Sequence, residues 1–360
     1  MQVLIACECS KDLGANRYVE VLEQALSSSG IHVRTSLLEF WNPTSHYDIV
    51  HFQWPEAVSL QGAHPSPTAL AALSARIAAY KRTGTKFVIT RHNALPHYND
   101  DPSAEALYQL VEHSCDAILH MGEYSRANIP SAHCADGVRH FVVPHHIYPC
   151  IERGISQSDS KKRLCLATSK KLVLAFGNFR ADEERMLVLR ARRQLQERDI
   201  SIIAPRLFQN HIFGRGKLAA LREIKYRLGF VRHGFFPHAG GPVPDEQMSF
   251  LFSAADAILI PRIVILNSGT LSMGFYFGKV VVGPDRGNVG EVLRQTGNPT
   301  FDPCSQDSLC EAIQRGLYLA ECGKGEENRS FADKHWHPHV IAAEIAKIYR
   351  TLLQDNKNHH

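Results

Sequence analysis

The sequence predicts an α/β protein built from two Rossmann-like doubly wound domains that face a central cleft. Short apolar segments alternate with longer amphipathic segments along most of the 360 residues, a pattern typical of βαβ units and a parallel sheet. The alternation occurs twice, on either side of a polar and charged stretch at 151–171. The length also favours two domains, at roughly 100–200 residues per domain.

The expected elements follow from apolar spacing along the chain. The first half has expected strands at 3–6, 33–37, 49–52, 87–90, 117–120 and 141–143, with clear helices at 18–28 and 66–82. The second half has expected strands at 172–177, 202–204, 232–236, 257–260 and 280–282, and helices at 183–198, 217–228, 245–254, 270–277 and 307–321. A final amphipathic helix is expected at 340–353. These elements divide the chain into domains at 1–155 and 156–339 and a terminal helix segment at 340–360.

Composition narrows the class of protein. Hydrophobic residues make up 44% and charged residues 21%, which is typical of a folded chain. The net charge of +4 does not demand a nucleic acid, and we expect none as a partner. Nine cysteines without a C-x-x-C pair indicate reduced thiols. The start resembles a strand rather than a secretory signal, so we expect a cytoplasmic protein; its charge permits peripheral contact with the inner face of the membrane.

Polar and aromatic side chains gather where strands of the first half end, the edge at which open α/β sheets bind ligands. These are His51, Trp54 and Glu56 around strand 49–52, His92, Asn93 and His97 after strand 87–90, and His145 and His146 after strand 141–143. A single histidine after a strand is more often structural than catalytic. Their recurrence at equivalent strand ends favours a site.

Two further groups lie at expected helix starts, where free N–H groups attract phosphates or hydroxyls. The first strand leads through Glu8 to a glycine loop with Gly14, Asn16 and Arg17. In the second half, a helix begins after Asn267, Ser268, Gly269 and Thr270, which suits a diphosphate. Neighbouring strand exits add Gly177, Asn178 and Arg180, then Arg206, and finally Glu291, whose carboxylate suits ribose or sugar hydroxyls.

At these residues the sequence resembles the GT-B glycosyltransferases, in particular bacterial enzymes of or near glycosyltransferase family four and related exopolysaccharide enzymes. The carrying segments are DIVHFQWPE, KFVITRHNALPH, FVVPHHIYP, VLAFGNFR and FSAADAILIPRIVILNSGTLSMGFYFGKVVVGPDRGNVGE. The resemblance implies that the N-terminal domain receives the acceptor and the C-terminal domain binds a nucleotide-sugar. It also implies that the helix at 340–353 crosses back to the first domain.

The same resemblance implies residue roles. His92 would touch the donor sugar or its leaving phosphate, and Arg180 would neutralise the diphosphate. Ser268, Gly269 and Thr270 would donate to the same phosphates, and Glu291 would approach the ribose. The sequence departs from the family at Glu183, where many members have a lysine, and Arg206 is a candidate replacement. It also has Ile265 and Met273 where many members have glutamates, which leaves a retaining or an inverting outcome open.

The resemblance implies a bacterial hexosyltransferase of polysaccharide biosynthesis that uses no cofactor and no metal. Its donor would be a UDP- or GDP-linked sugar, and its acceptor a saccharide or lipid-linked saccharide. An inverting reaction needs a base, for which the candidates are Glu8, His51, Glu56, His92 and Asp100, with Glu56 or His92 favoured. Two alternatives remain open on the same fold: a nucleotide-sugar 2-epimerase, and a catalytically inactive nucleotide-sugar or carbohydrate-binding protein.

Overall fold

The chain forms two compact units in a computed structural model. The structure describes residues 1–8, 17–94, 102–165, 168, 170–195, 199–207, 218, 220–221, 224–225, 228 and 243–355. The first unit holds the described residues up to His146 and again from His335, and the second unit spans Ile147–Lys334. Part of the expected helix 217–228, the expected strand 232–236, and Gly14, Asn16, His97 and Asp100 lie outside the described residues.

The first unit contains a six-stranded parallel sheet with the strand order β2-β1-β3-β4-β5-β6. The strands are β1 (Gln2–Ile5), β2 (His32–Thr35), β3 (Ile49–Phe52), β4 (Lys86–Arg91), β5 (Ala117–His120) and β6 (Arg139–Val142). The helices are α1 (Tyr18–Ser28), α2 (Leu37–Trp41), α3 (Pro55–Val58), α4 (Pro67–Arg82), α5 (Pro102–His113), α6 (Glu123–Ala127), the 3₁₀ turn η1 (Ser131–His133) and α15 (Pro338–Asp355).

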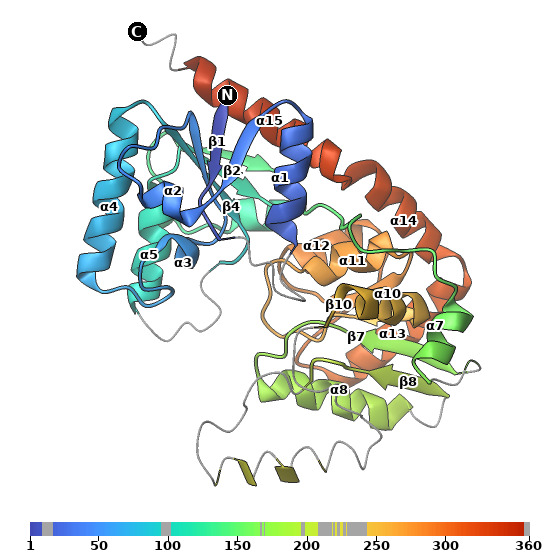
Figure 1. Cartoon of the computed structure of the whole chain (residues 1–360). Helices are drawn as coiled ribbons and strands as arrows, with labels where there is room; N and C mark the ends of the chain where they lie inside the picture. Colours follow the sequence, from blue (N-terminus) through green and yellow to red (C-terminus); the bar gives the residue numbers. More distant parts are fainter. Residues whose placement is uncertain are drawn as a thin grey trace. The chain divides into compact units, whose positions relative to one another are not determined.

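Helices cover both faces of this sheet, because successive side chains of each strand point to opposite sides. On one face Val3 and Ile5 of β1 pack with α1 and α15, and on the other Leu4 packs with α4 and α5. Helix α15 lies beside α1 (Figure 1). Its buried residues recur every three to four positions, which places them on one side of the helix: Ile341, Ile345, Ile348, Tyr349 and Leu352.

The second unit contains a five-stranded parallel sheet with the order β11-β10-β9-β7-β8. The strands are β7 (Lys171–Ala175), β8 (Ile200–Ile203), β9 (Ala257–Leu259), β10 (Val280–Pro284) and β11 (Thr300–Phe301). The helices are α7 (Gln157–Arg163), α8 (Asp182–Leu195), α10 (Asp245–Ala254), α11 (Gly269–Tyr276), α12 (Gly287–Gln295), α13 (Gln306–Glu321) and α14 (Lys324–His335).

Two glycines let helices of the second unit approach the sheet closely. A Cβ on Gly274 of α11 would lie 2.5 Å from Val281 Cγ2, and one on Gly316 of α13 would lie 2.7 Å from Val282 Cγ2. Neither position tolerates a larger side chain without movement of β10. The close approach fixes α11 against the sheet, so that its first turn lies at the carboxyl end of the strands.

Candidate functional site

The strand order of the second unit contains a topological switch point. The chain passes from β7 to its neighbour β8, and then to β9 on the other side of β7. Open α/β sheets bind ligands at the carboxyl ends of strands at such a point. The residues that leave these strands are Phe176, Gly177 and Asn178 after β7, and Ile260, Pro261 and Arg262 after β9.

The loop after β7 meets the start of α11. Gly177 has a φ of +124°, and a Cβ there would lie 3.8 Å from Thr270 Oγ1. Ser268 begins the helix as its N-cap, since its side chain accepts a hydrogen bond from the Thr270 N–H. Gly269 occupies the first helical position. The small residues Gly177, Ser268, Gly269 and Thr270 therefore lie together, and the partial positive charge of a helix N-terminus is directed there.

The turn between β10 and α12 packs on the same segment. Asn288 donates from Nδ2 to Asn267 Oδ1 at 2.7 Å and from its backbone N–H to Leu266 O at 2.9 Å. A side chain at Gly287 would overlap the backbone oxygen of Ile265. Glu291 follows one turn later on α12, is half-buried, and accepts from Gln295 Nε2 at 3.2 Å. Asn288 was not singled out from the sequence, although it lies in the expected glycine-rich stretch.

Glu184 lies at the same end of the sheet and contacts Arg262 and two backbone N–H groups. Arg262 forms a buried ion pair with Glu184, at 3.1 Å between Nη1 and Oε2. The backbone N–H groups of Arg180 and Ile263 also donate to this carboxylate, at 2.8 and 3.3 Å. Glu184 thus ties the loop after β7 to the exit of β9. Glu183, which replaces the expected lysine, is exposed on the first turn of α8.

Arg206 lies near Arg262. Burial lowers the pKa of Arg206, and the nearby Arg262 guanidinium lowers it further, although an arginine keeps its proton in proteins. Because Glu184 compensates the charge of Arg262, the nearby Arg206 adds positive charge at this end of the sheet, which favours an anion. The sequence pointed to Arg180 and Arg206 but not to Arg262. Arg262 could have been recognised from its position, two residues after Ile260 at the end of the expected strand 257–260.

In the first unit, His92 follows β4 and lies between two aromatic rings. Its ring stacks on Trp54, with centroids 4.5 Å apart, and meets Tyr18 edge-on at 4.7 Å. Its Nε2 lies 2.9 Å from Gln53 Oε1. Burial lowers the pKa of His92 well below its usual value, with smaller contributions from His145 and other histidines. The His92 imidazole is therefore neutral at physiological pH.

The histidines that follow β6 lie against Tyr18 as well. His146 stacks on the Tyr18 ring at 4.3 Å, and its Nε2 is 3.0 Å from the Tyr18 carbonyl oxygen. His145 meets the same ring edge-on at 4.8 Å. The exits of β4 and β6 thus converge on the first residue of α1. The structure brings His92, Trp54, His145 and His146 into one cluster.

His51 lies in the interior of the first unit. It is 0% exposed, with Nδ1 at 2.6 Å from the Tyr349 hydroxyl of α15 and Nε2 at 2.8 Å from Thr90 Oγ1. Burial lowers the pKa of His51 to about 3. Because both ring nitrogens have partners and no part of the ring reaches solvent, this geometry favours a structural role over the catalytic role expected from the sequence.

Glu56 lies on α3, which begins after Trp54. It is half-buried, and Oε2 accepts a hydrogen bond from the Tyr108 hydroxyl of α5 at 2.8 Å. Burial, followed by the Glu56 charge, raises the pKa of Tyr108. Asn93 is half-buried beside this pair and influences the same hydroxyl. Glu56, Asn93 and Tyr108 form a second polar group at the sheet edge that carries His92.

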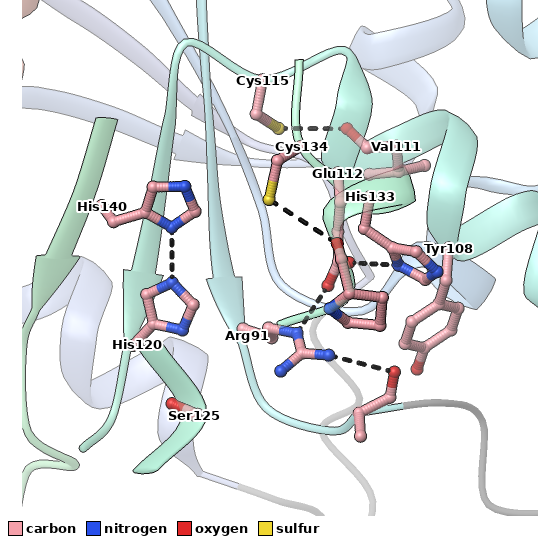
Figure 2. A network of polar contacts seen from close by, with 12 residues as sticks. Arg91, Tyr108, Val111, Glu112, Cys115, His120, Ser125, His133, Cys134 and His140 are labelled. Atoms are coloured by element: carbon pink, nitrogen blue, oxygen red, sulfur yellow. Dashed lines mark hydrogen bonds and ion pairs between the residues drawn. The ribbon is translucent and has the colours of Figure 1, made fainter. Parts of the chain in front are cut away.

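A buried charged network fixes the end of β4 (Figure 2). Arg91 Nε donates to Glu112 Oε1 at 3.0 Å, and His133 Nδ1 lies 2.6 Å from Glu112 Oε2. All three side chains are at most 3% exposed. Arg91 also reaches the Ala94 carbonyl oxygen, at 3.5 Å. The network therefore holds the backbone on both sides of His92 and Asn93.

The remaining residues expected at the acceptor loop are only partly described. Glu8 is exposed, and Arg17 donates from Nη1 to Glu20 Oε2 at 2.8 Å at the start of α1. Among the described residues, no group of three or more metal-ligating side chains lies close together. Within the same part of the chain, no helix combines the length and the apolar character needed to span a bilayer.

The two doubly wound parallel units are those of the GT-B fold, and solved GT-B glycosyltransferases resemble the chain over nearly its whole length. Sucrose-phosphate synthase from Thermosynechococcus elongatus is 15% identical, with a TM-score of 0.70, over 98% of this chain and 99% of that one. HepE from Anabaena, in complex with UDP-glucose, is 14% identical, with a TM-score of 0.68, over 98% and 100%. WaaG, a glycosyltransferase involved in lipopolysaccharide biosynthesis, is 14% identical, with a TM-score of 0.58, over 97% and 99%. No protein-family model and no curated protein matches the chain.

Proposed function

We propose that the protein is a glycosyltransferase that moves a sugar from a nucleotide-diphosphate sugar to a saccharide or lipid-linked saccharide, without a metal. The observation that carries this proposal is the arrangement at the switch point of the second unit. There the first turn of α11 lies beside Gly177, and Arg180 and Arg262 are joined through Glu184 at the same end of the sheet.

This arrangement suits the chemistry of glycosyl transfer. As the bond between the anomeric carbon and the diphosphate breaks, negative charge grows on the leaving phosphate, and preorganised donors stabilise it. The N-terminus of α11 and the Arg180 and Arg206 guanidinium groups supply positive charge without a metal. Glu291, on the neighbouring helix, would accept hydrogen bonds from the nucleotide ribose. The solved complex of HepE with UDP-glucose supports a uridine nucleotide as the first donor to test.

The first unit would supply the groups that act on the sugar and the acceptor. Because its pKa is held far below neutrality, His92 would act as a neutral hydrogen-bonding partner rather than as a carrier of protons. Glu56 remains the better candidate for a base, since its carboxylate is half-buried and accepts a hydrogen bond from the Tyr108 hydroxyl at the sheet edge that carries His92. Trp54 would offer an apolar face for a sugar ring.

Donor turnover tests the proposal directly. UDP-glucose, UDP-galactose, UDP-N-acetylglucosamine and GDP-mannose are incubated with the protein and with saccharide acceptors, and nucleotide release and sugar transfer are measured. Arg180→Ala and His92→Ala should each lower the rate at least tenfold. The matched controls, Arg190→Ala and His113→Ala, change exposed residues and should retain full activity.

The alternatives predict different products. A 2-epimerase would interconvert free nucleotide-sugars in the absence of an acceptor. A binding protein would bind a nucleotide-sugar without releasing its nucleotide. Either result, or equal activity of Arg180→Ala and Arg190→Ala, would contradict the proposed transfer reaction at this site.

A further inference from the structure

A pocket lies at the amino end of the sheet of the second unit. Its volume is about 440 Å³, within the range of small-molecule sites. It is lined by residues around Arg153, by the ends of α10 and α11, by Lys279 just before β10, and by Arg329 of α14. Helix α11 begins at the candidate diphosphate site with Gly269 and ends at this pocket with Tyr276. The two sites therefore lie at opposite ends of one helix.

The close approach of two glycines builds one wall of this pocket. A Cβ on Gly325 of α14 would overlap the carbonyl oxygen of Gly278, so only glycine lets α14 lie against the corner between α11 and β10. Residues four and eight positions after Gly325 fall on the same side of the helix. These are Arg329, which lines the pocket, and Asp333, which pairs with Arg153.

The pocket is basic. Three of its nine described lining residues are Arg153, Lys279 and Arg329, and none of the nine is acidic. Arg153 also binds Asp333 through two hydrogen bonds of 3.1 and 3.2 Å and lies over the Tyr276 ring. Arg329 pairs with Glu326 at 2.8 Å, where both side chains are about half-exposed, so that this pair is weak.

Lys279 is the most buried of the three cations. Its ammonium donates to the carbonyl oxygens of Ser253 and Ala255 at 3.0 and 2.8 Å. These two bonds use two of its three N–H donors. Burial lowers the pKa of Lys279 to about 8, although Asp256 partly offsets this effect. An anion in the pocket would stabilise the charged form and occupy the third donor.

We propose that this pocket binds a small phosphate-bearing anion, either inorganic phosphate or a phosphate monoester. Arg329 can present two parallel N–H groups to phosphate oxygens, while Lys279 adds a point charge from the pocket floor. Tyr276 and Phe277 provide an aromatic wall for the organic part of an ester. A purely structural role explains Lys279 through its two carbonyl acceptors and Arg153 through Asp333. The partly exposed pair with Glu326 leaves the Arg329 guanidinium available to an anion at little cost.

Isothermal titration calorimetry tests the proposal on the full chain at constant ionic strength. The probes are inorganic phosphate and glycerol 3-phosphate, with chloride as the balancing anion. We expect saturable binding with one site, weakened at least tenfold by Arg329→Gln and by Lys279→Met. Lys347→Met, an exposed lysine in the first unit, is the matched control and should bind normally. Tighter binding of the ester would identify a phosphorylated small molecule, and equal binding would identify free phosphate.

The candidate diphosphate site also attracts phosphate, so each titration is repeated with Arg180→Ala. Binding at the proposed pocket should persist in this variant. The proposal is overturned by an absence of binding, or by binding that Arg180→Ala abolishes while Arg329→Gln leaves it intact. Because Arg329 is 45% exposed, Arg329→Gln should fold even where Lys279→Met does not.

Discussion

Replacement of Glu112 by glutamine should strongly destabilise the first unit. Glu112 is 0% exposed, and its two oxygens accept from Arg91 and His133 (Figure 2). The glutamine amide keeps one acceptor oxygen. Its NH₂ group is a donor and would face the N–H of either Arg91 or His133, so that no hydrogen bond can form there. The change also removes the carboxylate charge of Glu112 that faces the Arg91 guanidinium, which is 3% exposed. Breaking a buried pair in this way costs about 3–5 kcal/mol, a large part of the stability of a typical domain.

Urea unfolding, monitored by tryptophan fluorescence, measures this loss of stability in the first unit. All three tryptophans, Trp41, Trp54 and Trp336, belong to the first unit. With a slope of about 2 kcal/mol per molar urea, the midpoint should fall by roughly 1.5–2.5 M. Glu105→Gln changes an exposed carboxylate on the same helix and should stay within about 0.5 kcal/mol of the parent.

A double variant separates charge from shape. In Arg91→Met/Glu112→Leu both charges of the Arg91–Glu112 pair are removed together, while His133 loses its carboxylate partner. Apolar replacement of a whole buried pair is often neutral or stabilising, and we expect this variant to regain at least half of the loss. If Glu112→Gln unfolds at the same urea concentration as Glu105→Gln, the Arg91–Glu112–His133 network does not anchor β4 and does not hold His92 in place.

Two further changes test other parts of the structure. The pKa of His51 is about 3 in the folded protein against about 6.5 when unfolded, so the unfolded chain binds more protons and stability is lost as pH falls from 6.5 towards 3. His51 alone should lower the free energy of unfolding by about 2 kcal/mol at pH 5, which would appear as a lower urea midpoint. A midpoint that stays constant between pH 7.5 and 5 would contradict this prediction. Gly177→Ala places a side chain at a φ of +124°, so it should lower the free energy of unfolding by about 1–3 kcal/mol and weaken UDP binding in calorimetry. The control Gly137→Ala, also at positive φ but in the first unit, should leave UDP binding unchanged.

Periodicity sufficed for most of the fold because parallel sheets are made of short, continuous apolar runs. The strand at Ile49–Phe52 and the helix at Gly269–Tyr276 lie where that pattern placed them. Strand β11 and the helices α2, α3, α5, α6, α7, α12 and α14 were not among the expected elements. The two-residue strand β11 and the polar helix α14 carry no apolar period long enough to detect. Helix α14 is held by the contact of Gly325 with Gly278, which depends on tertiary packing and leaves no local trace.

The candidate site was harder to predict than the fold, since a side chain type does not reveal its partner. His51 and His92 both lie at or just beyond a strand end in the sequence, yet one is bonded to α15, 298 residues away, and the other stacks on Trp54. Arg262 and Glu184 are 78 positions apart, and only the folded sheet brings them together. A signal for Arg262 existed in its position after a strand; none existed for its pairing with Glu184.

The two units share one topology but differ in charge at their strand exits. In each sheet the first strand along the chain lies between the second and the third. Both sheets therefore have a switch point. In the second unit this end collects arginines and a helix N-terminus, which suit a diphosphate. In the first unit it collects imidazoles that burial keeps neutral, as for His92 and His145. A neutral imidazole can bind hydroxyl groups without repelling the positive charge that develops on a reacting sugar, whereas a protonated one would oppose it. Burial of these histidines would therefore favour the proposed reaction as well as follow from packing.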